Sequence, residues 1–127
     1  MIAFQIPYFD LQSGKWMYQR ANPHTNPNGS YIYPKSRFGH SITRHGDTLY
    51  MVGGCDGTQA YRNLWTFHLP TLEWKCHQDV YLPRAVHFHA AAISEDGEMS
   101  IFGGVQINRP INRMLQMSVK HKVPRLH

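Results

Sequence analysis

Cysteine is scarce in this chain, and so is any long run of apolar residues. Only Cys55 and Cys76 occur among the 127 residues. Two cysteines are too few for a disulfide framework, which favours a reducing compartment such as the cytoplasm or the nucleus. The apolar runs are far shorter than the roughly 20 residues of a membrane-spanning helix, so no membrane contact is expected. The first ten residues have neither the basic start nor the continuous apolar core of a signal peptide.

Helical periodicity is also missing, whereas aromatic and turn residues are plentiful. No stretch of about a dozen residues free of Gly and Pro places apolar side chains at i, i+3, i+4 and i+7. Aromatic residues make up 13% of the chain, and β-sheets accommodate such side chains well. Short β-type runs bounded by turn residues recur along the chain instead. The sequence therefore predicts an all-β protein.

Turn residues divide most of the chain into a hairpin, a long loop and one sheet. Residues 4–11 and 15–20 predict the hairpin. Residues 21–35 hold three prolines and predict a long polar loop, either a functional excursion or a disordered insert. The strands of the antiparallel sheet are expected at residues 38–44, 48–52, 64–69 and 73–78.

The chain also repeats itself at a spacing of about 50 residues. One shared feature is a doublet, Gly53-Gly54 in the earlier copy and Gly103-Gly104 in the later one. The other is a tryptophan after a turn, at Trp16 and Trp74. Three copies of one motif are therefore present, and only the middle one is complete. The aligned segments are residues 37–41 with 86–90, 45–54 with 95–104, and 9–16 with 67–74.

A four-stranded repeat with a Gly-Gly doublet after the second strand and a tryptophan in the fourth resembles the kelch repeat. Propeller blades narrow toward a central axis, where residues without Cβ permit close backbone approach. A large aromatic side chain fills the wider outer gap between neighbouring sheets. The resemblance implies a partial kelch β-propeller. Its parts are the end of a blade (residues 1–20), the long polar loop (21–35), one complete four-stranded blade (36–79), a partial blade (80–119) and a basic tail (120–127).

Among kelch proteins, the middle of the chain is similar to the kelch domain-containing protein 10 family. The similarity lies in residues 37–41 and 88–92, in Leu64-Trp65 and in Trp74. It implies a protein–protein interaction module without catalytic residues or a cofactor. Such a module recognises the C-terminal peptide of a client protein for a cullin-RING ubiquitin ligase, and elongin and cullin-2 dock on a region missing from this chain. The alternative is a truncated kelch fragment with no independent function.

Ligand sites of kelch propellers lie in the loops before the first strand and between the second and third strands of a blade, here residues 34–38, 55–62, 81–87 and 105–113. The resemblance implies a peptide site in these loops. Guanidinium groups would hold a carboxylate, because their fork matches its two oxygens. The alternative is that the arginines pair with acids between blades, and Arg37 is the one most expected to be structural. The candidate ligand-binding residues are Arg37, Tyr61, Arg62, Arg84 and His87, with Ser36 beside them.

A small metal-dependent, cupin-like enzyme is the hypothesis from another class. His87 and His89 face the same way if they lie on one strand, so both imidazoles could bind one ion. Against this, His89 aligns with His40 in the repeat, which favours a structural histidine. Cys76 and His77 are adjacent on an expected strand and point to opposite faces, so they do not form a catalytic pair.

Nucleic acid is not expected as a partner, although the formal net charge is +5. Such a charge suits nucleic acid, an acidic protein or a carboxylate ligand. The basic residues are dispersed, however, and no aromatic ladder with interleaved Lys or Arg appears. A client protein or peptide is therefore the expected partner.

Overall fold

The computed structural model describes residues 4–106, 109–110, 114–118 and 123–126, and within them every regular element is a β-strand. The expectation of an all-β protein is confirmed. No helix long and apolar enough to cross a membrane occurs in the described part of the chain. The strands are β1 (Gln5–Asp10), β2 (Lys15–Arg20), β3 (His24–Thr25), β4 (Tyr31–Ile32), β5 (Ser41–His45), β6 (Thr48–Val52), β7 (Asn63–His68), β8 (Glu73–Tyr81), β9 (Ala90–Ile93), β10 (Glu98–Phe102), β11 (Val105–Gln106), β12 (Arg109–Pro110), β13 (Met114–Ser118) and β14 (Val123–Leu126).

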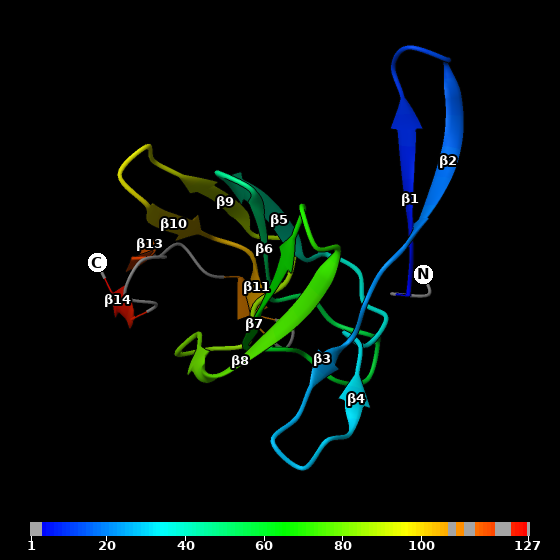
Figure 1. Ribbon diagram of the computed structural model, residues 1–127. Helices are drawn as coiled ribbons and strands as arrows, with labels where there is room; N and C mark the ends of the chain where they lie inside the picture. Colours follow the sequence, from blue (N-terminus) through cyan, green and yellow to red (C-terminus); the bar gives the residue numbers. More distant parts are fainter. Residues whose placement is uncertain (1–3, 107–108, 111–113, 119–122, 127) are drawn as a thin grey trace.

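The central unit is a four-stranded antiparallel meander in the order β5-β6-β7-β8, as the repeat predicts (Figure 1). Each strand pairs with the next through a short turn, except that a longer loop separates β6 from β7. The last strand is longer than expected and continues to Tyr81, with a register shift opposite Asn63 and Leu64. This sheet lies where the sequence predicts a complete blade, residues 36–79, and its last strand ends beyond that range.

A second four-stranded sheet follows, in the order β9-β10-β13-β14. The sequence predicts a basic tail at residues 120–127, but Val123–Leu126 form β14 and pair antiparallel with β13, Leu115 opposite Leu126. A short segment with Pro124 and Arg125 does not read as a strand by itself. Its pairing partner supplies the ladder, which the residues of the tail alone cannot reveal.

The expected N-terminal hairpin is β1–β2, and Figure 1 shows it projecting away from the two larger sheets. Its turn repeats the geometry of the turn between β7 and β8. Gly14 has φ +68° and Leu72, at the equivalent repeat position, has φ +57°. Phe9 pairs with Trp16 just as Phe67 pairs with Trp74. The hairpin is therefore the structural equivalent of β7–β8.

The long polar loop lies against the outer edge of β8. Asn22 accepts a hydrogen bond from the Trp74 amide at 2.9 Å and donates its own amide to Leu72 O at 2.7 Å. The Nδ1 atom of His24 accepts the Cys76 amide at 3.2 Å. Within this segment β3 and β4 form a small hairpin of their own. These bonds give the edge of β8 a partner.

Two apolar clusters lie on opposite faces of the β5–β8 sheet, because side chains alternate along each strand. One cluster joins this sheet to the second sheet, and Leu64 and Met99 lie fully buried in it. The other covers the opposite face, where Trp65 and Trp74 meet edge to face with ring centroids 6.2 Å apart. The first cluster consists of Tyr50, Val52, Leu64, Val80, Leu82, Val86, Met99, Ile101 and Leu115, and the second of Ala21, Met51, Trp65, Phe67 and Trp74.

The first strands of the two sheets, β5 and β9, lie side by side and form a seam (Figure 1). His89 Nε2 and Ser41 Oγ are 2.8 Å apart across it, and the Gly54 amide donates to Val86 O at 2.8 Å. A Cβ on Gly53 would stand 2.5 Å from Val86 O and 2.7 Å from His89 Cε1. The glycine doublet is therefore required by the close approach of the sheets, as the repeat predicts.

Leu64→Ala tests how much stability comes from the cluster between the sheets. Leu64 is 1% exposed, so the substitution leaves a cavity and is expected to cost about 2–5 kcal/mol of unfolding free energy. The matched control is Leu11→Ala, because Leu11 is 88% exposed and its loss should change stability by less than about 0.5 kcal/mol. Urea unfolding followed by tryptophan fluorescence measures both. Equal effects would show that the sheets do not pack as described.

Gly53→Ala tests the seam itself. Gly53 and Gly57 both have left-handed backbones, φ +71° and +99°, so alanine at either position pays the same kind of backbone cost. Only at Gly53 does the new Cβ meet another backbone atom, because Gly57 has nothing within 4 Å. Gly53→Ala should therefore lose about 1–3 kcal/mol more than Gly57→Ala in urea unfolding. A loss no larger than that of Gly57→Ala would contradict the close approach.

Acid should weaken the seam through its histidines. Burial, together with His40 and His87, lowers the pKa of His89, and burial beside Arg37 lowers that of His40. In the unfolded chain these imidazoles take up protons near pH 6.5, while the fold resists doing so. Their contribution to stability is complete above about pH 6.5 and is lost as the pH falls toward their lowered values.

The urea midpoint should accordingly be lower at pH 5 than at pH 7.5, and His89→Gln should reduce that difference. His68→Gln is the control, because His68 is exposed at the far end of β7. If both substitutions leave the pH dependence unchanged, the half-buried imidazoles of the seam are not its cause.

Candidate functional site

Three of the four predicted loops come together at one end of the β5–β8 sheet. The loop before β5 pairs with the loop after β6 through Phe38 and Cys55, whose amides and carbonyls bond at 2.8 and 3.0 Å. The loop after β8 joins them, because Leu82 N donates to Arg62 O at 2.7 Å. The fourth loop is described only at residues 105–106 and 109–110, and its end, Arg113, lies outside the described residues. We call this end of the molecule the loop face.

Asp56 braces the loop between β6 and β7 from within. Its Oδ1 accepts the Gln59 amide at 2.6 Å and the Thr58 amide at 2.9 Å, and its Oδ2 accepts the Tyr61 hydroxyl at 2.9 Å. These bonds, led by that of Gln59, hold the pKa of the Asp56 carboxyl well below its usual range. The carboxylate therefore stays charged and the loop keeps one shape near neutral pH.

Two predicted site residues, Arg37 from the loop before β5 and Tyr61 from this loop, pack on each other. The Arg37 guanidinium lies 4.2 Å from the centroid of the Tyr61 ring, and both residues are buried. Arg37 donates to Lys35 O, to Gly53 O and to Asn63 Oδ1 at 3.1–3.3 Å. Its bonds thus tie together the loop before β5, the glycine doublet and the start of β7. Arg37 thus supports the fold as a structural arginine, but through carbonyl and amide oxygens and not through the acid that the alternative predicts.

Arg62 is exposed on the loop face and lies over an aromatic ring. Its guanidinium carbon is 5.0 Å from the centroid of the Tyr81 ring, and its Nε donates to Leu82 O at 2.8 Å. Both contacts fix the plane of the guanidinium group. Beside it is a hollow of about 450 Å³ lined by Gln59, Ala60, Tyr61, Arg62, Asn63, Gln78 and Tyr81.

The two remaining candidates lie on the loop that follows β8. Arg84 is exposed and His87 is half-buried. His87 borders a second hollow of about 360 Å³, whose other lining residues are Phe38, Cys55, Gly57, Thr58, Gln59 and Ala60. The two hollows share Gln59 and Ala60. The structure thus places Arg62 and His87 at adjoining hollows.

The premise of the cupin-like alternative is wrong, because residues 87–89 are not a strand. Phe88 has φ +58° and turns the chain, so His87 and His89 do not alternate along one face. His87 borders the loop-face hollow, whereas His89 reaches Ser41 at the seam. No cluster of three or more potential metal ligands is found among the residues that the structure describes. Cys76 and His77 do point to opposite faces, Cys76 toward Trp74 and His77 toward Thr66.

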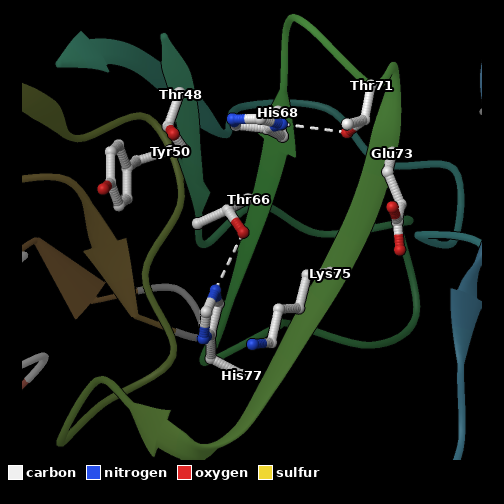
Figure 2. A pocket seen from close by; sticks show the side chains of 8 residues that line it. All are labelled: Thr48, Tyr50, Thr66, His68, Thr71, Glu73, Lys75 and His77. Atoms are coloured by element: carbon white, nitrogen blue, oxygen red, sulfur yellow. Dashed lines mark hydrogen bonds between the residues drawn. The ribbon is translucent and has the colours of Figure 1, made fainter. Parts of the chain in front are cut away.

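A third hollow, which the sequence analysis missed, lies on the face of the β5–β8 sheet that carries Tyr50. Figure 2 shows its polar side chains, with Thr66 Oγ1 2.8 Å from His77 Nε2 and His68 Nδ1 2.9 Å from Thr71 Oγ1. Its volume is about 330 Å³. Polar residues at every second position of β7 and β8 were the signal in the sequence for this polar face. The lining residues are Thr48, Tyr50, Thr66, His68, Thr71, Glu73, Lys75 and His77.

Comparison with known proteins agrees with this architecture. A family model described as the KLHDC2/KLHL20/DRC7 Kelch-repeats domain matches residues 5–123. The chain is 31% identical over 113 residues to the Kelch domain-containing protein 10 homolog of Drosophila melanogaster, covering 80% of this chain and 19% of that protein. To Kelch domain-containing protein 10 of Homo sapiens it is 28% identical over 101 residues, covering 80% and 22%.

A more distant similarity covers a smaller part of the chain. The tRNA wybutosine-synthesizing protein 2/3/4 of Oryza sativa subsp. japonica is 36% identical over 76 residues, which are 57% of this chain but 7% of that protein. This chain spans about a fifth of the length of the Kelch domain-containing protein 10 relatives. Kelch-repeat domains are generally protein-binding. The four-stranded sheets and the glycine doublets of the chain agree with such a domain. The chain belongs to this kelch-repeat family, because the family model matches most of its residues.

Proposed function

We propose that the loop face binds a client protein and that Arg62 holds a carboxylate of the bound peptide. The observation that carries the proposal is the fixed guanidinium plane of Arg62 above Tyr81. Its Nε is already satisfied by Leu82 O. Its two terminal nitrogens make no hydrogen bond within the described part of the chain, so we propose that their fork meets the ligand. Two parallel N–H···O bonds to a carboxylate are stronger and more selective in direction than a contact with a point charge.

The surroundings of Arg62 favour an extended peptide. Gln59, Asn63 and Gln78 line the same hollow and offer amide donors and acceptors for a peptide backbone. Arg84 and His87 add a second cation and an imidazole on the neighbouring loop. In this proposal Arg37 and Tyr61 act indirectly, by supporting the loop that presents Arg62. The net charge of +5 favours an acidic partner.

We further propose that the bound carboxylate is the C-terminus of a client protein, in substrate recognition for a cullin-RING ubiquitin ligase. The resemblance in sequence supports this role. Contacts with elongin and cullin-2 are proposed for a region outside these 127 residues. A C-terminal residue presents a carboxylate at a free chain end, which suits the open hollow beside Arg62.

Arg62→Ala should weaken binding of peptides with a free C-terminal carboxylate by about 10- to 100-fold, because it removes a charge-assisted, two-pronged bond. Arg62→Lys should lose most of that affinity, because an ammonium group lacks the planar fork. Fluorescence polarisation with a library of labelled peptides, in free-acid and C-terminally amidated forms, measures these differences.

The matched control is Arg44→Ala. Arg44 is also exposed, and its Nε also donates to a backbone carbonyl, that of Gly46 at 2.9 Å, but at the other end of the sheet. Arg44→Ala should bind as the unaltered chain does. Equal binding of free-acid and amidated peptides, or equal losses in the two variants, would refute the carboxylate role of Arg62.

A further inference from the structure

Phe88 combines an uncommon backbone conformation with an exposed aromatic ring. Its φ is +58°, in the left-handed region that side chains with a Cβ seldom adopt. The equivalent position of the preceding repeat is Gly39, which has φ +68° and no side chain to conflict with it. The fold therefore requires a left-handed backbone at this repeat position, and in the later repeat the residue that adopts it is phenylalanine. The residue is nevertheless 63% exposed, so core packing does not account for a phenylalanine here.

Contacts with the preceding repeat hold Phe88 in place. Its amide donates to Gly39 O at 2.8 Å, and its ring lies over Gly39, where a Cβ would meet Phe88 Cδ1 at 3.1 Å. The ring also stands next to Phe38 at 6.1 Å and next to His87 at 5.0 Å between centroids. The three rings form what we call the aromatic shelf. Backbone strain that the surroundings maintain is found most often at ligand-binding positions.

The aromatic shelf borders the apolar hollow of the loop face. Phe38 and His87 line that hollow directly, together with Cys55 and Ala60. Phe38 is 48% exposed, so this part of the shelf is open as well. Gln59 and Ala60 form the shared wall between this hollow and the hollow of Arg62. A short peptide that crosses this wall reaches an apolar surface on one side and a cation on the other.

We infer that the aromatic shelf of Phe38, His87 and Phe88 receives a large apolar side chain, preferably aromatic, of the peptide whose carboxylate Arg62 holds. The inference rests on the proposed function and adds the class of side chain that the site selects. Aromatic rings favour edge-to-face or offset contacts with further rings. Because Arg62 lies at the adjoining hollow, the expected ligand is a peptide that carries both an apolar side chain and a carboxylate.

Two matched peptides test the inference. They have the same length and a free C-terminus and differ only in Phe or Ala next to the terminal residue. The unaltered chain should bind the Phe peptide about tenfold more tightly, because an aromatic side chain leaves water. Phe88→Gly should bind the two peptides within about twofold of each other and should bind the Ala peptide as the unaltered chain does.

The choice of glycine keeps the variant folded, because the preceding repeat already uses glycine at this position. Its thermal melt should be within a few degrees of that of the unaltered chain. Phe102→Ala is the control for loss of an exposed phenylalanine, because Phe102 is 51% exposed on β10. This control should retain the preference for the Phe peptide.

Each other outcome overturns the inference in a distinguishable way. If Phe88→Gly keeps the preference, or if the unaltered chain binds both peptides equally but loses them on amidation, the aromatic shelf is not a side-chain site, while the carboxylate role stands. If neither peptide binds, the proposed function fails together with the inference. If Phe88→Gly instead changes the molecular mass measured by light scattering, the shelf is a contact between copies of the chain.

Discussion

The packing of the two four-stranded sheets and the position of the loops both depend on the close approach of the sheets at a glycine-lined seam. Gly53 and Gly54 leave no room for a side chain beside Val86 O, Phe38 O and the imidazole of His89. The apolar faces of β6, β7 and β10 can then meet and bury Leu64, Met99 and Ile101. The loops that flank the seam come together as a consequence, since each begins or ends at a strand that the seam holds. The loop face is thus a product of sheet packing rather than of loop sequence alone.

Within the loop face, charge is used in two different ways. Asp56 and Arg37 are satisfied inside the protein, by backbone amides and by backbone carbonyls respectively. Tyr61 connects them, with its hydroxyl on Asp56 and its ring beside Arg37. Arg62, the next residue, donates instead from its Nε to Leu82 O. Asp56, Tyr61 and Arg37 therefore form a connected base beside the exposed Arg62. This is the arrangement expected of a site that must keep its geometry when a ligand binds.

The features that depend on the repeat and its glycines, such as the central sheet, were predicted well from the sequence. The features that depend on partners distant in sequence were predicted poorly. The short β-type runs at residues 48–52 and 64–69, bounded by turn residues, and the doublets at 53–54 and 103–104 led to the correct central sheet. The strand at Val123–Leu126 was missed, because its pairing with β13 is not encoded in its own residues. His87 and His89 do not alternate on one strand, because Phe88 turns the chain between them. The glycine at the equivalent repeat position, Gly39, was a sign of this turn in the sequence. Proximity to Tyr81, the feature that sets Arg62 apart, was likewise outside the reach of sequence reasoning.

The projecting hairpin has a consequence for how the molecule opens. Phe67 and Trp74 are 3% and 5% exposed, whereas their equivalents Phe9 and Trp16 are 46% and 69% exposed. The same pair of rings therefore has neighbours on one hairpin and mostly solvent on the other. Resistance to opening comes largely from such neighbours, so stability is graded along the chain. Backbone amides of β1 and β2 are therefore expected to exchange with solvent through local opening, while those of β6 and β7 should exchange only when the whole sheet opens. A slow-exchanging centre and a fast-exchanging arm would then be built from the same repeat.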